Sequence, residues 1–408
     1  MDGQLRLLRE QVGDSRALLE WLTHRIDVSK AFYLVCEPGY PNYGDELIAG
    51  EWLKYLARVH PDIPVVVDCA RPGPASAILR LKHPHLTIVD TVARLTLEND
   101  FVKTGVAGLP QIAEFVRKAL DDESMAARYV AGIHLLQYGV RSVHILGGGY
   151  LNARWYANLA RLELAAWGAE RHIPVIMTGA GLMPLEDDVA AEYVRRSIAS
   201  FERCTLRDEQ SYESVRGGAN CELAPDDCFI NGLEGCYSDD DNLPEIMVCI
   251  QSDLVDDRNA LYSHVADVLR EWNVDAELEI GVVECNPYVD YPILPYLQEC
   301  GYRCRFFPTS YLLDRGFPAR PGQRWLSTRY HPHVLAAARG CSGAYIAVDD
   351  EYYGIKHHAV LRMGSHWSES RIGAGAVSPG AGFTDDDLPW RYARQIRHTA
   401  SVVYGYEG

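Results

Sequence analysis

Residues suited to handling an anion occur in a few short segments of this chain. Arg329 and His331 are two positions apart in LSTRYHPHVLAAARG, so they share a face if the period of a strand continues through them. A guanidinium group binds phosphate through paired N–H donors, and an imidazole moves protons near neutral pH. This pair therefore predicts phosphate binding combined with proton transfer, and we treat the nearby His333 as a spectator.

Two further cations stand where predicted strands end. Arg207 is followed by Asp208 and Ser211 in TLRDEQSYE, and Lys356 lies in VDDEYYGIKHH. Both cations suit an anionic ligand because each follows the carboxyl end of a predicted strand, where ligands of such sheets bind. A salt-bridged Arg–Asp pair and a solvent-facing lysine are the structural alternatives.

Two glycine-rich turns link predicted strands to the helices that follow. LGGGYLN contains Gly147, Gly148 and Gly149, and TGAGLMPLED contains Gly181. Glycine lets the backbone approach a ligand closely, and the start of a helix offers free N–H groups to an anion. The GxGxxG pattern of a dinucleotide site is missing, and tight packing of strand against helix explains the same glycines without a ligand.

A polar loop follows the first apolar run, AFYLVCE. It reads GYPNYGDELI and holds Asn42, Gly44, Asp45 and Glu46 immediately before a stretch with helical spacing. It is not a phosphate-binding loop of the Walker type, because the lysine and the glycine spacing of that motif are missing. An acidic pair here suits a partner with hydroxyl groups.

The elements that must position these residues alternate between short apolar runs and amphipathic stretches, which is typical of parallel sheets. The first series of predicted strands covers 31–37, 63–68, 86–90, 142–148, 174–181 and 203–208. An acidic segment with glycine and proline at 224–245 predicts a linker. The second series covers 245–253, 276–284, 302–310, 324–330 and 343–350, with helices near 257–273 and from about 332.

This order predicts an α/β protein with two Rossmann-like domains that face a cleft. The first domain, 1–235, begins with a leading helix, and the second covers 236–380. The segment 381–408 contains a helix that is expected to pack back towards the first domain.

Composition excludes several classes of protein. The chain has 408 residues and a formal net charge of -17, which argues against nucleic acid and anionic membranes as partners. No run approaches the roughly 18 apolar residues of a membrane span, and the charged start is unlike a secretory signal, so we expect a cytoplasmic location. The 11 cysteines are scattered without a CxxC motif, which predicts reduced thiols and neither disulfides nor a metal site.

The ordered set of motifs resembles the polysaccharide pyruvyl transferase family over roughly residues 31 to 360. The residues that carry this resemblance are Asn42, Gly44, Asp45, Glu46, Gly147, Gly148, Gly149, Gly179, Gly181, Arg207, Asp208, Ser211, Pro225, Asp226, Arg329, His331 and Lys356. The resemblance implies a two-domain fold like that of GT-B glycosyltransferases. It also implies transfer of pyruvate from phosphoenolpyruvate to two hydroxyls of a sugar or glycan as a ketal, with release of phosphate.

For that reaction we assign His331 as the general acid and Arg207 and Arg329 as the clamp on phosphate and carboxylate. Asp45 or Glu46 assists the attacking hydroxyl. The substrate-binding set is completed by Asn42, Gly44, Glu46, Gly147, Gly148, Gly149, Gly181, Asp208, Ser211 and Lys356.

The chemistry requires no cofactor and no metal. A nucleotide-sugar-dependent glycosyltransferase and a non-catalytic protein that binds a glycan or metabolite are the alternatives, and a homo-oligomer is compatible with the sequence.

Overall fold

The computed structural model describes residues 30–97, 108–185, 188–215, 220–375 and 377–405. Its first half is built on a seven-stranded parallel sheet in the order β3-β2-β1-β4-β5-β6-β7. The strands are β1 (Ala31–Val35), β2 (Val65–Asp68), β3 (Leu86–Val89), β4 (Val140–Ile145), β5 (Val175–Ala180), β6 (Arg203–Leu206) and β7 (Cys221–Leu223). The helices are α2 (Tyr43–Val59), α3 (Pro72–Leu79), α4 (Thr91–Leu97), α6 (Leu109–Asp121), α7 (Val130–Tyr138), α8 (Glu163–Glu170), α9 (Asp188–Ile198) and α10 (Glu209–Ser214), with the 3₁₀ segments η1 (Glu123–Tyr129) and η2 (Ala153–Leu162).

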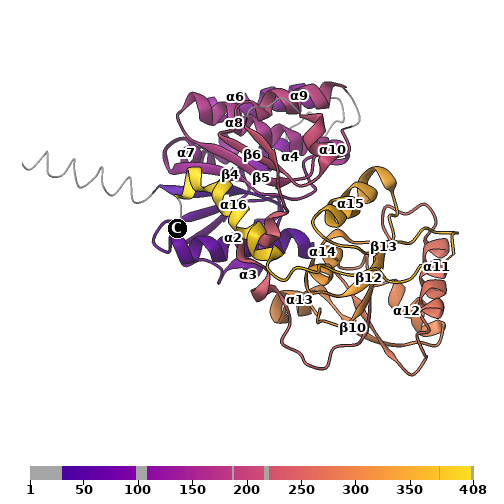
Figure 1. Cartoon of the computed structure of the whole chain (residues 1–408). Coiled ribbons are helices and arrows are strands. Elements are labelled where there is room, and N and C mark those ends of the chain that lie inside the picture. Colours follow the sequence, from indigo (N-terminus) through magenta and orange to yellow (C-terminus); the bar gives the residue numbers. More distant parts are fainter. Residues whose placement is uncertain (1–29, 98–107, 186–187, 216–219, 376, 406–408) are drawn as a thin grey trace, which may run out of the picture.

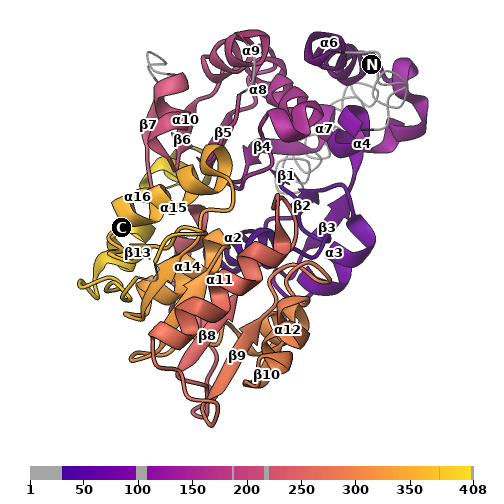
Figure 2. The ribbon, with the colours of Figure 1, turned by 90° about the vertical axis from the view of Figure 1, so that its right-hand side faces the viewer.

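The second half repeats this topology in a six-stranded parallel sheet, in the order β10-β9-β8-β11-β12-β13. The strands are β8 (Ile246–Cys249), β9 (Glu279–Val283), β10 (Arg303–Phe307), β11 (Arg324–Ser327), β12 (Ser342–Tyr345) and β13 (Ser368–Glu369). The helices are α11 (Arg258–Glu271), α12 (Ile293–Glu299), α13 (Thr309–Arg315), α14 (Tyr330–Ala338) and α15 (Ile355–Arg362), preceded by the short π-helix η5 (Asp350–Gly354). The two halves form separate lobes that meet along one side (Figures 1 and 2).

The predicted fold class is confirmed, because each sheet has the strand order of a doubly wound Rossmann fold. Each strand of both predicted series appears in the structure. Most of these strands are buried along their whole length, as β1, β2, β5 and β8 show, and this burial explains their continuously apolar sequences. The short edge strands β7 and β13 were not predicted, since two or three residues at a sheet edge leave little pattern. The predicted leading helix lies outside the described residues.

Ligand sites of such sheets lie at the carboxyl ends of the strands, where the strand order reverses. In the first half this point lies between β1 and β4, and in the second half between β8 and β11. The predicted polar loop after β1, the glycine turn after β4 and the Arg329 segment after β11 all start at these positions. The topology therefore places the predicted motifs of both halves at their ligand-binding ends.

The segment predicted as a linker, 224–245, joins the two sheets, but its first part is buried. Residues 227–230 of η3 (Asp227–Asn231) are fully covered, and η3 packs on α2. The acidic sequence there is therefore structural in part, and only the later residues, such as Asp239 and Asp241, are exposed.

The chain returns to the first half with α16 (Leu388–Tyr404), which packs on η3, β5 and β6 and lies across the first lobe in Figure 1. The Tyr404 hydroxyl is 2.8 Å from Nδ1 of the buried His144, and Arg397 Nε donates to the Ile230 carbonyl at 3.0 Å. These contacts show that α16 packs on the first half, and the limits 1–235, 236–380 and 381–408 stay our proposed division of the chain. Among the described residues, no helix is long and apolar enough to cross a membrane.

Candidate active site

A cavity of about 710 Å³ lies where the carboxyl ends of the two sheets face each other. Loops and helix starts from both halves line it. The predicted site residues on its wall are Asn42, Gly44, Asp45, Gly149, Arg207, Arg329, His331 and Lys356. The structure thus brings both predicted arginines, the predicted histidine and the lysine to one cavity, although they come from distant parts of the chain.

Arg207 follows β6 and is held by a carboxylate that comes from the predicted linker. Its Nη1 donates to Asp226 Oδ2 at 2.6 Å, and its guanidinium lies over the Tyr330 ring at 4.4 Å. Arg207 is 2% exposed and Asp226 is fully buried. Burial raises the pKa of Asp226, but the neighbouring His331 and Arg207 outweigh this and hold it well below its usual range. Asp226 is therefore a permanent negative charge behind the cavity wall.

His331 starts α14 and packs against α2 of the other half. A Cβ atom built on Gly44 would lie 1.9 Å from His331 Nδ1, so the ring approaches the helix only because residue 44 has no side chain. On its other side, Nε2 is 3.7 Å from Asp226 Oδ1. Asp226 therefore lies between Arg207, a residue of the predicted phosphate clamp, and His331, the predicted general acid.

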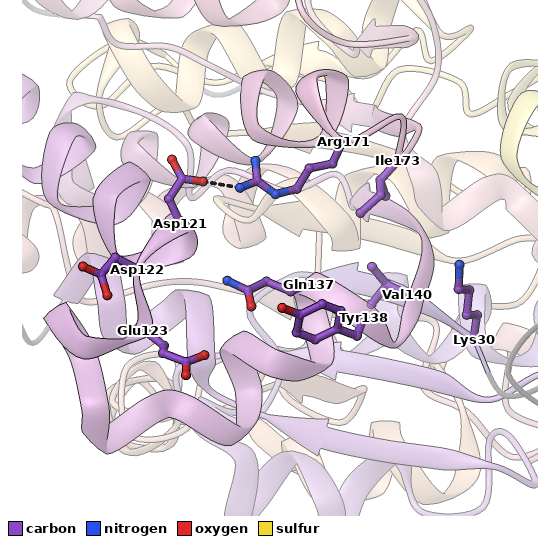
Figure 3. A pocket seen from close by; sticks show the side chains of 9 residues that line it. All are labelled: Lys30, Asp121, Asp122, Glu123, Gln137, Tyr138, Val140, Arg171 and Ile173. Atoms are coloured by element: carbon purple, nitrogen blue, oxygen red, sulfur yellow. Dashed lines mark hydrogen bonds and ion pairs between the residues drawn. The ribbon is translucent and has the colours of Figure 1, made fainter.

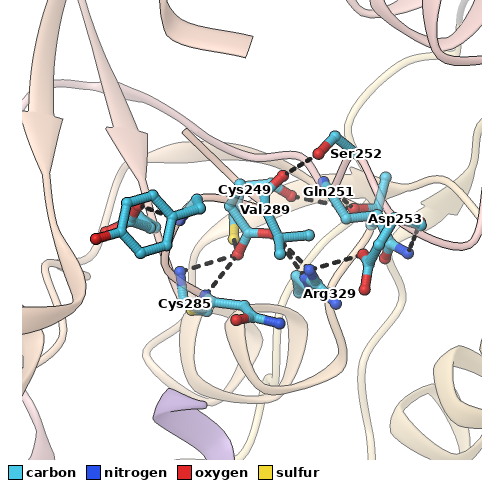
Figure 4. Close-up of polar contacts among 12 residues, drawn as sticks. Cys249, Gln251, Ser252, Asp253, Cys285, Val289 and Arg329 are labelled. Atoms are coloured by element: carbon cyan, nitrogen blue, oxygen red, sulfur yellow. Dashed lines mark hydrogen bonds and ion pairs between the residues drawn. The ribbon is translucent and has the colours of Figure 1, made fainter. Parts of the chain in front are cut away.

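Arg329 precedes His331 and is surrounded by acceptors (Figure 4). Its Nε and Nη2 donate to Asp290 Oδ1 at 2.9 and 2.6 Å, Nη2 also donates to Asp253 Oδ1 at 3.0 Å, and Nη1 donates to the Tyr353 hydroxyl at 3.1 Å. Asp290 is fully buried and also accepts the amide N–H of Cys285 at 3.0 Å. The guanidinium is rigidly oriented, and most of its donors are already used.

Lys356 and Asp45 face the same space from opposite halves. The Lys356 ammonium lies 3.5 Å from the centre of the Tyr352 ring, and a Cβ atom on Gly149 would lie 2.8 Å from it. Burial, with added repulsion from Arg207, lowers the pKa of Lys356 well below its usual range, although Asp45 opposes this. Burial likewise raises the pKa of Asp45 to about 6, against the attraction of His331 and Lys356. Asp45 is held by Asn42, whose Nδ2 donates to it at 2.8 Å.

The other predicted site residues do not line the cavity. They are Glu46, Gly147, Gly148, Gly181, Asp208 and Ser211. Glu46 Oε1 accepts the amide N–H of Gly39 at 2.6 Å, and burial raises its pKa to about 8. Asp208 caps α10 by accepting from the Ser211 amide and hydroxyl at 2.7 and 2.8 Å. These residues shape the loops that carry Asp45 and Arg207.

The Gly147 amide was predicted to face the anionic donor, but it is already occupied. Its N–H donates to Asp227 Oδ2 at 2.8 Å, and Thr178 Oγ1 donates to the same oxygen at 2.7 Å. Burial raises the pKa of Asp227 to about 6. The glycine turn is thus fixed from behind by a buried carboxyl, and only Gly149 reaches the cavity.

Two buried histidines connect the helices that carry His331 and Lys356. His333 Nδ1 lies 3.0 Å from His357 Nδ1, and His357 Nε2 lies 3.2 Å from the Thr328 carbonyl oxygen. That oxygen only accepts, so His357 carries its proton on Nε2 and accepts from His333 through Nδ1. The predicted spectator His333 is therefore a structural link between α14 and α15.

Several residues of the site were missed from the sequence. Asp226 entered only through the family resemblance, and Asp290, Asp253, Tyr352 and Tyr353 were not singled out. Asp226 lies in the acidic segment 224–245 and Asp290 in the proline- and tyrosine-bearing loop CNPYVDYP, so only their burial in the folded chain distinguishes them. The adjacent tyrosines before Lys356 were a usable signal, because the face of an aromatic ring attracts a nearby lysine ammonium.

A second hollow lies at the amino ends of β4 and β5, away from the predicted residues (Figure 3). Its wall carries the ion pair between Arg171 and Asp121, alongside Lys30 and Tyr138. Within the described ranges, no group of three or more His, Cys, Asp or Glu side chains is arranged to hold a metal ion.

Comparison with solved structures gives similar folds at low identity. The UDP-GlcNAc 2-epimerase from Neisseria meningitidis, bound to UDP-GlcNAc, is 11% identical with a TM-score of 0.46, and 92% of each chain is covered. The UDP-GlcNAc 2-epimerase from Methanocaldococcus jannaschii is 8% identical with a TM-score of 0.47, and 90% of this chain and 92% of that chain are covered. The glycotransferase of kitacinnamycin is 13% identical with a TM-score of 0.44, covering 92% and 96%.

Sequence comparison assigns the family. No curated protein matches the chain significantly. The family model described as polysaccharide pyruvyl transferase matches residues 42–350, which cover most of the chain and include every residue of the predicted motif set except Lys356. This chain belongs to the polysaccharide pyruvyl transferase family.

Proposed function

We propose that the protein transfers pyruvate from phosphoenolpyruvate to two hydroxyls of a sugar or glycan, as a ketal, and releases phosphate. The observation that carries this proposal is the single cavity at which Arg207, Arg329, His331 and Lys356 meet. A cluster of cations in a protein of net charge -17 suits a small, highly charged anion.

Each residue of the cavity has a distinct task. Arg207 presents donors to the phosphate: among the described residues, its Nη1 alone has an acceptor, so Nε and Nη2 remain free for a ligand. Lys356 lies next to Gly149, where no side chain separates it from the donor, and the negative charge of phosphoenolpyruvate favours the ammonium form that burial disfavours. Arg329 has most of its donors committed to carboxylates, so it contributes its fixed positive charge and one remaining N–H.

The reaction begins when His331 gives a proton to the methylene carbon of phosphoenolpyruvate. The double-bond electrons form the new C–H bond, and the central carbon becomes an oxocarbenium-like electrophile. An acceptor hydroxyl attacks this carbon and passes its proton to Asp45, whose pKa of about 6 suits a base near neutral pH. Phosphate then leaves with the electrons of its C–O bond and takes the proton held by Asp45. The second hydroxyl attacks the same carbon and passes its proton to His331, which closes the ketal and restores the acid.

Single substitutions test this assignment. We expect His331→Ala and Lys356→Ala each to lower phosphate release from phosphoenolpyruvate in the presence of acceptor by about a hundredfold or more. His358→Ala is the matched control, because His358 is an exposed histidine on the same helix as Lys356. Calorimetry with phosphoenolpyruvate should detect binding to the native protein and weaker binding to Lys356→Ala.

Two results would refute the proposal. One is near-native phosphate release by folded His331→Ala protein. The other is thermal stabilisation by a nucleoside diphosphate with none by phosphoenolpyruvate, which is the outcome expected of a nucleotide-sugar-dependent glycosyltransferase.

A further inference from the structure

The outer part of the cavity is lined by exposed aromatic side chains that the mechanism above does not use. Tyr40, Trp155 and Tyr156 are 54%, 44% and 37% exposed, and all of them line the cavity. By contrast, Tyr43, Tyr150 and Trp325, which also lie close to the motifs in the sequence, are buried. Large rings that stay in contact with water and gather at one cavity mark a binding surface.

Trp155 is connected to the cationic end of the cavity through a single ring. Its centre lies 6.0 Å from that of Tyr352, with the ring planes 62° apart. Tyr352 in turn carries the Lys356 ammonium on its face and donates its hydroxyl to the Gly149 carbonyl oxygen at 3.1 Å. A group that rests on Trp155 is therefore a neighbour of a group that Lys356 binds.

The position of Trp155 is fixed by the backbone around it. Asn152 caps η2, since its Oδ1 accepts the Arg154 N–H at 3.0 Å and its Nδ2 donates to the Gly149 carbonyl at 2.8 Å. Trp155 itself has non-helical dihedral angles, φ -125° and ψ 51°, which kink η2 at this residue. The glycine turn and the exposed indole are thus parts of one braced loop.

Tyr40 is held at the same cavity by a second loop of the first half. The Arg71 guanidinium lies 4.3 Å from the centre of the Tyr40 ring, and Arg71 also lines the cavity. Gly39 allows this contact, because a Cβ atom at its φ of 93° would lie 2.5 Å from the Arg71 carbonyl oxygen. The loops after β1 and β2 therefore bring a second aromatic surface to the cavity.

We propose that Trp155, Tyr156 and Tyr40, which we call the aromatic rim, form the subsite for the sugar ring of the acceptor. Sugar rings have C–H faces that pack on aromatic rings, while their hydroxyls bond the polar groups around them. Phosphoenolpyruvate is too small to fill about 710 Å³ and too anionic to prefer the rim over the cations. The rim is open to solvent, so the acceptor is the end of a glycan chain that continues outside the cavity.

This inference depends on the proposed function, but its test is separate. The native protein, saturated with phosphoenolpyruvate, is applied to an array of immobilised oligosaccharides, and the best glycan is then titrated in solution. Trp155→Ala should weaken glycan binding by about tenfold or more, which corresponds to about 1.4 kcal/mol, and Trp155→Phe should restore most of it. The affinity for phosphoenolpyruvate alone should change less than about twofold, because Tyr352 stands between Trp155 and Lys356.

Tyr138→Ala is the matched control, since Tyr138 is 71% exposed but lines the other hollow. Equal glycan affinity of native protein and Trp155→Ala would overturn the rim, and so would a native protein that binds no glycan of the array. The proposed function fails differently: glycans would bind, while phosphoenolpyruvate would neither bind nor release phosphate.

Discussion

Replacing Asp226 by asparagine is the sharpest test of how the site is built. Asp226 is fully buried, accepts from Arg207 Nη1 at 2.6 Å and from the Cys228 amide at 2.9 Å, and faces His331. Asparagine keeps the shape and the backbone contact but removes the charge. The variant therefore removes the carboxylate to which the Arg207 guanidinium, only 2% exposed, donates its hydrogen bond.

The size of the effect follows from that burial. Removing one partner of a buried ion pair costs about 3–5 kcal/mol, because the remaining charge is neither solvated nor paired. We expect this loss in the free energy of unfolding of Asp226→Asn at neutral pH. A solvent-exposed pair would contribute only about 0–1 kcal/mol, so the two possibilities are well separated.

Urea unfolding, followed by both tryptophan fluorescence and far-UV circular dichroism, measures this loss. Coincident transitions are required before the free energies are compared. Asp241→Asn is the control, because Asp241 is an exposed acidic residue of the same segment, and it should change stability by less than about 0.5 kcal/mol. A loss below about 1 kcal/mol in Asp226→Asn would refute the claim that this carboxylate neutralises the clamp.

Three further predictions follow from the geometry of the site. Asp45 must be ionised to accept a proton, and burial raises its pKa to about 6, so kcat/KM should rise as the pH increases through about 6. Asp45→Asn should abolish this rise in the pH–rate profile. A variant that kept the same rise would exclude Asp45 as the base. Gly44→Ala should lower kcat about as much as loss of His331, since the new Cβ would displace its ring, whereas Gly50→Ala in the same helix, with no atom nearer than 3.9 Å, should be near native. Burial lowers the pKa of His357 to about 3, so its contribution to stability is complete above the unfolded pKa of about 6.5 and is lost as pH falls towards 3. Between pH 6 and 4, the free energy of unfolding measured in urea should therefore fall by about 1.4 kcal/mol per pH unit more in the native protein than in His357→Gln. Equal pH dependence of the two proteins would contradict a neutral His357 bound to His333.

The sequence predicted the sheets because strands buried on both faces are continuously apolar, as VVVD of β2 and IMVC of β8 show. It also predicted which turns meet, since all parallel strands point their carboxyl ends the same way. Arg329 and His331 were found from types and spacing alone, and both line the cavity.

What the sequence could not predict depends on contacts between distant segments. Nothing local indicates that Gly44 is small to admit the ring of His331, because the two residues belong to different halves. Asp226 stands in the acidic segment predicted as a linker, and only the folded chain shows that it lies between Arg207 and His331. For the glycine turn, the sequence predicted a ligand contact that the structure does not show, since the Gly147 N–H donates to Asp227 of the chain itself.

The return of α16 to the first lobe has a consequence for how the chain matures during synthesis. The ribosome releases all strands of the second half before α16, yet Tyr404 of that helix is buried beside His144 in the first half. Although domains generally fold in turn as they emerge, the surface of η3 and β5 in this first half is covered only when α16 packs on it. The last apolar surface of the first lobe is covered only after the second lobe has been synthesised. A completed first lobe therefore means that both lobes have been translated.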